Sequence, residues 1–202
     1  MPTSPAASPT VSSTIGLKNV VIAPLTADTE TSHTYGDLQL VAGAIEASIT
    51  PNNTDPNVQY ADDVEFDVLW PDPDLTFRLQ MADLPLAIQE MILSNNIDKN
   101  GVLVKSADDE PGYYAVGFKS EKANGKYRFV WLYKVRAKPV TQNFGTKQGN
   151  TINRQNSEVE FTAIKRTHLG YFQAVADEDE NGFTASDGET FLSSVYEPDF
   201  TT

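Results

Sequence analysis

Apolar and polar residues alternate along three segments of the chain, and this alternation constrains the fold more than any other feature. The segments are residues 64–70 (VEFDVLW), 75–81 (LTFRLQM) and 158–163 (EVEFTA). Side chains along a β-strand point alternately to opposite faces, so each segment is predicted to be a strand with one face on a core. Residues 17–23, 38–50, 102–105 and 171–175 are weaker strand candidates. The chain is therefore expected to be mainly β.

A β-hairpin is predicted around Asn124-Gly125, because this dipeptide accepts the positive φ angles of a two-residue turn. A two-residue loop there would fix the register of the two strands. The predicted cross-strand pairs are Phe118 with Trp131, Val116 with Tyr133, Tyr114 with Val135, and Glu121 with Arg128. The first three pairs would form one buried aromatic face.

Only one helix is predicted. Apolar residues recur at helical spacing over 84–92, with Asp83 as a candidate cap and Pro85 in the first turn. The chain as a whole is predicted to divide into a flexible N-terminal arm (1–14), a β domain (15–176) that includes this helix, and a polar, irregular C-terminal arm (177–202). Residues 1–14 have neither the basic start nor the apolar run of a secretory signal.

Charge and composition exclude several classes of protein. The 202 residues carry 15 Lys and Arg against 28 Asp and Glu, a net charge of −13, which argues against tight binding of nucleic-acid phosphates. The chain contains no Cys, so disulfides, Cys-ligated zinc and thiol nucleophiles are excluded. No segment approaches the ~18 apolar residues of a membrane span, so no membrane insertion is expected.

Signals for catalysis are weak. The sequence has no glycine-rich phosphate loop, no Gly-x-Ser-x-Gly elbow and no His-Glu-x-x-His motif. His33 and His168 are the only histidines, and their spacing matches no known site. The acids between Asp62 and Asp74 could include a catalytic carboxylate pair, but strand alternation already explains their pattern. No catalytic residue and no cofactor is predicted.

Residues 177–182 (DEDENG) match the first half of a calcium-binding loop, with oxygen ligands at alternate positions and a glycine at the turn. Asp177, Asp179 and Asn181 are the calcium candidates. The second half of the motif does not match, because Gly188 occupies the twelfth position. An acidic turn without metal is the simpler interpretation.

Basic residues share one parity of the segment 126–138, opposite the aromatic residues of the same strand. RNA binding would need both kinds on one face. In so acidic a chain, the stripe is better interpreted as a surface for the acids of another subunit, with Lys134 and Arg136 as candidate interface residues.

Several short segments resemble the major tail protein family of bacteriophages with long, non-contractile tails that infect Gram-positive bacteria. They are residues 15–20 (IGLKNV), 60–63 (YADD), 82–86 (ADLPL), 116–118 (VGF) and 125–134 (GKYRFVWLYK). The resemblance extends from Ile15 to about Val175. It implies two packed antiparallel β-sheets with one flanking helix, and extended loop and terminal arms.

The resemblance also implies a structural function in the virion, without catalytic residues. Such proteins form hexameric rings that stack, around a tape-measure protein, into the tube through which DNA is ejected. Assembly takes place in the host cytoplasm. A conduit should not bind its cargo, so acids on the polar strand faces are candidates for the lumen: Glu65, Asp67, Glu158 and Glu160. The alternative is a calcium-assisted, carbohydrate-binding or surface-binding β-sandwich module; an enzyme with an acidic cleft is third.

Overall fold

The computed structural model describes residues 11–52, 57–61, 64–69, 74–140 and 156–200. Two helices, α1 (Leu86–Leu93) and α2 (Ala185–Phe191), accompany the strands. The strands are β1 (Thr14–Asp28), β2 (His33–Tyr35), β3 (Gln39–Val41), β4 (Ala44–Pro51), β5 (Asn57–Ala61), β6 (Val64–Leu69), β7 (Leu75–Met81), β8 (Asn96–Ile97), β9 (Leu103–Val104), β10 (Tyr114–Lys122), β11 (Tyr127–Ala137), β12 (Ser157–Ala163) and β13 (Gln173–Asp177). Neither helix is long and apolar enough to cross a membrane.

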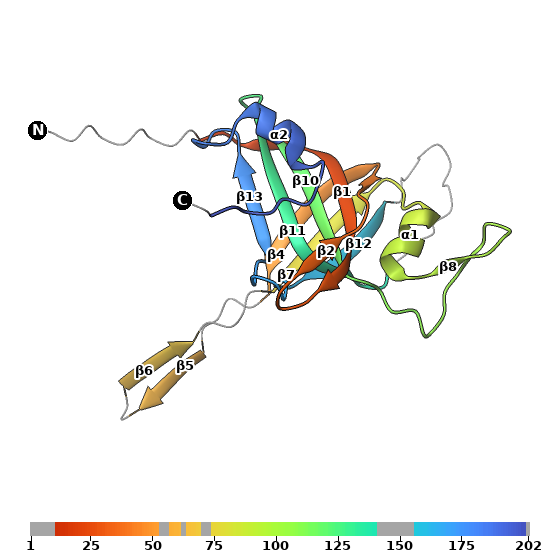
Figure 1. Ribbon diagram of the computed structural model, residues 1–202, viewed down its shortest axis with the longest axis horizontal. Coiled ribbons are helices and arrows are strands. Elements are labelled where there is room, and N and C mark those ends of the chain that lie inside the picture. Colours follow the sequence, from red (N-terminus) through yellow and green to blue (C-terminus); the bar gives the residue numbers. More distant parts are fainter. Residues whose placement is uncertain (1–10, 53–56, 62–63, 70–73, 141–155, 201–202) are drawn as a thin grey trace, which may run out of the picture.

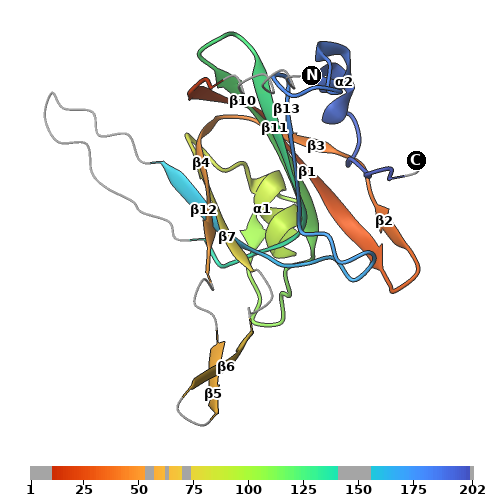
Figure 2. The same cartoon turned by 90° about the vertical axis from the view of Figure 1, so that its left-hand side faces the viewer.

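Nine strands form one antiparallel sheet in the order β2-β1-β10-β11-β12-β7-β4, with β3 beside β1 and β13 beside β11. Strand β11 pairs with β12 only through its last residues, Val135–Ala137, so the sheet turns there. The two halves then face each other across one core, in which residues of β1 meet residues of β7 (Figure 2). The expected mainly β fold with packed antiparallel layers is confirmed, and its two layers belong to one continuous sheet.

The core confirms the alternation predicted for residues 75–81 and 158–163. Phe77 and Phe161 are cross-strand partners and both are buried, and Phe118 of β10 stacks on Phe77 from the facing layer. Burial of each such side chain contributes ~1.5–3 kcal/mol. The polar residues between them, among them Arg78 and Glu160, lie on the other face of the same strands.

The β10–β11 hairpin forms as predicted, but its register near the turn is shifted by one residue. Gly125 N–H donates to the Lys122 carbonyl and Lys122 N–H to the Lys126 carbonyl, so the loop has three residues, 123–125. Only Gly125 has positive φ, as in a type I turn followed by a bulge. A bulge farther along the hairpin restores the predicted pair of Tyr114 with Val135.

This shift makes the other predicted pairs wrong. Trp131 lies opposite Gly117, Phe118 opposite Val130, Val116 opposite Leu132, and Arg128 opposite Ser120. A one-residue slip moves a side chain to the opposite face of the sheet. Phe118 therefore packs in the main core, whereas Trp131 packs on the other side of the sheet.

The C-terminal segment covers that other side of the sheet, and it contains a helix where the sequence predicts an irregular arm. Helix α2 lies over β10 and β11 (Figure 1), and Trp131 Nε1 donates to the Phe191 carbonyl at 3.0 Å. Thr184 and Asp187 form a capping box at its N-terminus. Gly188 lets the helix approach closely, because a β-carbon there would lie 2.7 Å from Phe129.

The predicted helix is confirmed as α1. Pro85 is its N-cap rather than part of its first turn, and Asp83 accepts from Leu84 N–H instead of capping the helix. Ser94, with φ of 53°, ends it. Ile92 and Leu93 are buried against the main core.

The segment 64–70 forms a strand, but its predicted burial is wrong. Strand β6 pairs only with β5, and Figures 1 and 2 show this two-stranded hairpin projecting away from the nine-stranded sheet. Phe66 is 74% exposed and Val68 is 42% exposed. Alternation predicts which side chains share a face, but it does not say that the chain itself covers that face. Trp70 lies outside the described residues.

Candidate functional site

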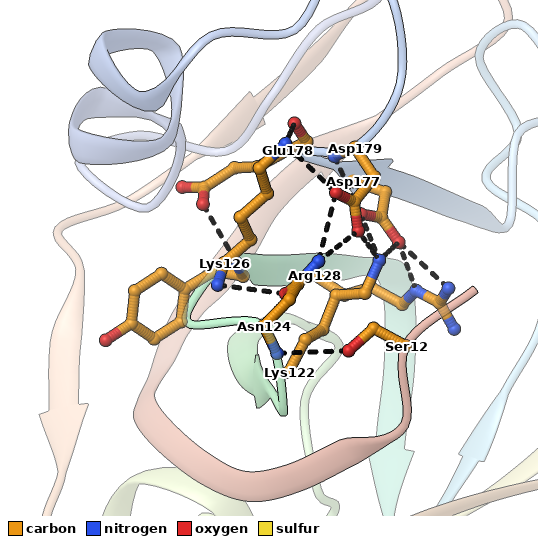
Figure 3. Close-up of polar contacts among 9 residues, drawn as sticks. Ser12, Lys122, Asn124, Lys126, Arg128, Asp177, Glu178 and Asp179 are labelled. Carbon is orange, nitrogen blue, oxygen red and sulfur yellow. Dashed lines mark hydrogen bonds and ion pairs between the residues drawn. The ribbon is translucent and has the colours of Figure 1, made fainter. Parts of the chain in front are cut away.

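A polar cluster joins the β10–β11 turn to the acidic segment 177–180 (Figure 3). At its centre is Lys122, whose side chain is only 2% exposed. Its ammonium donates to Asp177 Oδ1 at 2.8 Å and also to Asp179 Oδ2. Arg128 Nε donates to Asp177 at 2.9 Å, and Lys126 Nζ lies 3.0 Å from Asp179.

The charges in this cluster stabilise one another. The hydrogen bond from Lys122, followed by that from Lys126, lowers the pKa of Asp179. Burial works to raise the pKa of Asp177, but hydrogen bonds from Lys122, the Asp179 amide and Arg128 outweigh it and lower that pKa. The same two carboxylates raise the pKa of Lys122, and the hydrogen bond to Asp177 contributes more than that to Asp179.

This geometry bears directly on the calcium candidates. Asp177 and Asp179 do converge, but on the Lys122 ammonium, and Asn181 lies in an exposed turn. No group of three His, Cys, Asp or Glu residues in the described ranges is arranged to hold a metal ion. A resident ammonium occupies the position at which a cation would meet the two carboxylates.

A second cluster surrounds Arg166, whose side chain is fully buried. Its guanidinium donates to both carboxylate oxygens of Glu197, at 2.7 and 2.9 Å, and lies over the Tyr133 ring. Glu197 belongs to the segment after α2. The Arg166–Glu197 pair therefore fastens this segment to the sheet.

The two histidines, which sequence spacing left unrelated, lie together beside this pair. Their ring centroids are 5.0 Å apart, and His33 Nε2 is 2.9 Å from Glu197. His168 N–H donates to Asp28 Oδ1 at 3.0 Å. The contacts link β1, β2, the 164–170 loop and the C-terminal segment, and they serve to hold these elements together.

The two candidate interface residues, Lys134 and Arg136, have different surroundings. Lys134 is mostly buried and donates to Asp28 Oδ2 at 2.7 Å within the same chain. Burial works to raise the pKa of Asp28, but the hydrogen bonds from Lys134 and the Thr167 and His168 amides lower it. Arg136 is 40% exposed, and its contact with the exposed Glu110 is long, at 4.0 Å. Arg136 keeps a charge that a partner could use, whereas Lys134 already has its counter-ion.

The four candidate lumen acids fall in two places. Glu158 and Glu160 lie on the polar face of β12, beside Gln80 and Arg78 of β7. Glu160 accepts from Arg78 at 2.9 Å and from Lys138, and these two hydrogen bonds lower its pKa, Lys138 contributing more. Glu65 and Asp67 lie in β6, on the projecting hairpin. The structure therefore does not bring all four onto one surface.

Sequence reasoning missed the residues on which both clusters depend. The sequence analysis singles out none of Lys122, Arg166 and Glu197. The helix that covers Trp131 did carry a signal, since Thr184 and Asp187 have capping-box spacing. The pairing of Arg166 with Glu197 has no signal in the sequence, because it depends on tertiary packing.

The comparison with protein-family models matches residues 33–195 to the family described as phage tail tube protein. The matched segment covers most of the chain, including strands of both layers and α2. The resemblance seen in the sequence is confirmed at the level of the family. No curated protein matches the chain. From the family match and the fold, we conclude that this chain belongs to the phage tail tube protein family, a family of structural proteins of the virion tail.

Proposed function

We propose that this chain builds the wall of the tail tube by assembling into hexameric rings that stack around a tape-measure protein, and that the finished tube conducts DNA during ejection. Membership of the tail tube family supports a structural, self-assembling function. Ring stacking, the tape-measure partner and assembly in the host cytoplasm are parts of the proposal.

The projecting β5–β6 hairpin carries the proposal of self-assembly. It presents Phe66 and Val68 to solvent at a distance from the sheet, and none of the other described strands pairs with it. Large apolar side chains exposed on a projecting element are typical of an interaction site. In a tail tube protein, the simplest partner is another copy of the same chain.

The polar face of β12, β7 and β4 supports the proposal of a conduit. Cross-strand rows on it run Glu158–Gln80–Glu46 and Glu160–Arg78–Ser48. The β10–β11 half of the sheet has apolar cover on both faces, so it is less suited to line a wet channel. Arg78 and Lys138 neutralise Glu160, which leaves a hydrated face with little net attraction for phosphates.

Electron microscopy of the concentrated protein tests self-assembly. Subunits at −13 repel one another, so salt should promote assembly; the Debye length is ~10 Å at 0.1 M. Rings or tubes are expected from the wild type, and folded monomers from Phe66→Asp. Leu169→Asp is the control, because Leu169 is another exposed apolar residue away from the hairpin. Uniform wild-type monomers at every salt and protein concentration would contradict the proposal.

Ejection kinetics test the lumen residues. A Lys at a bore position is repeated around every ring, so Glu158→Lys or Glu160→Lys should slow DNA ejection from assembled phage, with relief at high salt. Glu65→Lys and Asp67→Lys test the hairpin positions in the same way. Glu189→Lys, on α2, is the control. Wild-type kinetics for all four reversals would reject these acids as the lining.

A further inference from the structure

A pocket of about 370 Å³ lies at the C-terminal end of α1, between the loop after β9 and the end of β11. Its apolar lining includes Leu93 and Ala137, both buried, together with Pro111 and Val140. Lys105, Arg136 and Lys138 also line it. An apolar floor with several cations is unusual on so acidic a protein.

Two of these cations are poorly compensated. Within the described ranges Lys105 has no ion pair, and the carboxylate nearest to Arg136 is that of Glu110, at 4.0 Å. Lys138, by contrast, pairs with Glu160. The one acid in the lining, Asp109, accepts from Asn95 Nδ2 at 2.8 Å and from Ser106 N–H at 2.7 Å. The pocket therefore favours a ligand that brings negative charge.

The pocket also contains an unused acceptor. Asn95 lines it and is 7% exposed, and its Oδ1 is buried without a hydrogen-bond partner in the described part of the chain. Asp109 fixes the orientation of this amide, because a flipped amide would place oxygen against the carboxylate. An incoming backbone N–H could satisfy Oδ1.

We infer that this pocket, here called the basic pocket, receives the β5–β6 hairpin of a second copy of the chain; the inference rests on the proposed self-assembly and names its acceptor surface. Residues 57–69 contain four acids and no Lys or Arg. Phe66 supplies an exposed aromatic side chain for the apolar floor.

Charge favours the hairpin as occupant over the segment that follows Val140 in the sequence. Residues 141–155, which follow Val140 directly, contain Lys147 and Arg154 and no acid. They offer no complement to Lys105 and Arg136. The acidic hairpin does, and complementary charges fix the register of a contact as well as accelerating encounter.

The positions of the two surfaces determine what such a contact builds. In Figures 1 and 2 the hairpin lies well away from α1, beside which the basic pocket lies. One chain's hairpin therefore does not fill its own pocket. A contact between two different surfaces of the same chain is head-to-tail, and repetition of it generates closed rings or open helical stacks.

Cysteine cross-linking between full-length chains tests the contact directly, because the chain has no native cysteine. One copy carries Val68→Cys, which retains Phe66, and the other carries Ser106→Cys, in the lining of the basic pocket. Mixing the two under mild oxidation should give a covalent dimer. Ser186→Cys is the matched control, an exposed serine on α2, and should give none.

A charge-reversal variant tests whether the cross-linked dimer depends on the cations of the basic pocket. Lys105→Glu combined with Arg136→Glu, in the chain with Ser106→Cys, should abolish the cross-link while circular dichroism shows a folded subunit. Equal cross-linking at Ser106 and Ser186, or no effect of the reversal, would overturn the inference. Tubes without the Ser106 cross-link would reject only the basic pocket, whereas the cross-link without rings or tubes would reject the proposed function.

Discussion

Gly117 lies directly opposite Trp131 in the β10–β11 pair, and a β-carbon at Gly117 would lie 2.8 Å from three atoms of the indole ring. The indole covers the glycine, and α2 covers the indole. This arrangement explains a glycine in the middle of a strand, where it otherwise weakens the structure.

Gly117→Ala should therefore destabilise the protein. Because the added methyl group must displace Trp131, the free energy of unfolding should fall by ~1–3 kcal/mol. Gly16→Ala is a matched control in β1, since its β-carbon would be 3.8 Å from Glu121. Urea unfolding followed by tryptophan fluorescence measures both. Equal stability of Gly117→Ala and the wild type would contradict the packing described.

Glu197→Gln should loosen the C-terminal segment. The change leaves the buried Arg166 guanidinium without its counter-ion, and a cost of ~1–3 kcal/mol is expected for a partly exposed pair. Limited proteolysis after α2 and the melting temperature report the effect. Glu189→Gln, on the exposed side of α2, should leave both unchanged. Protection of the segment in Glu197→Gln would show that Arg166 does not hold it.

The Lys122 cluster should make stability depend on pH at two extremes. The lowered pKa of Asp179 stabilises the fold above its unfolded pKa of ~3.9, and this contribution is lost as the pH falls toward the folded value. The raised pKa of Lys122 stabilises the fold below its unfolded pKa of ~10.4. This contribution to stability is lost as the pH rises above that value.

Asp179→Asn tests the acidic limb. The wild type should be more stable than this variant at pH 7. The difference should shrink as the pH falls below ~4, because the carboxylate of the unfolded wild type then takes up a proton while the folded one is still ionised. Urea midpoints across the pH range measure it. A difference that is the same at pH 7 and at pH 2 would exclude a charge effect.

Lys134 and Arg136 should respond differently to the same substitution. Lys134→Gln removes the counter-ion of the mostly buried Asp28 and should cost ~3–5 kcal/mol. Arg136→Gln should leave the melting temperature unchanged, since its only described ion pair is long and exposed. Equal melting temperatures for the two variants would contradict this division. Arg136→Gln is also expected to weaken assembly, which sedimentation measures.

The sequence predicted features that depend on local pattern and missed those that depend on tertiary contacts. Alternation identified β7 and β12 with their buried faces, and helical spacing identified α1. Alternation also identified β6, but it did not show that Phe66 would remain exposed. That property depends on where the hairpin lies.

The predicted register of the β10–β11 hairpin is wrong by one residue, because a single dipeptide does not determine the length of the loop. Asn-Gly suits both a two-residue turn and a three-residue loop with a bulge, and these differ by one residue in pairing. The acidic segment 177–182 is a different case, because its sequence fits both a metal-free turn and a weak calcium loop. Asp177 and Asp179 do converge, but on the ammonium of Lys122, which the spacing of the acids could not reveal.

Because the ammonium of Lys122 is tethered covalently to the strand it stabilises, its encounter with Asp177 and Asp179 is part of folding itself. A diffusible ion would stabilise this corner by mass action, to an extent set by its concentration in the medium. A tethered cation has a fixed local concentration, unaffected by dilution or by chelators. The junction between the β10–β11 turn and the C-terminal segment should thus form without any metal ion supplied by the medium, inside a cell or outside it.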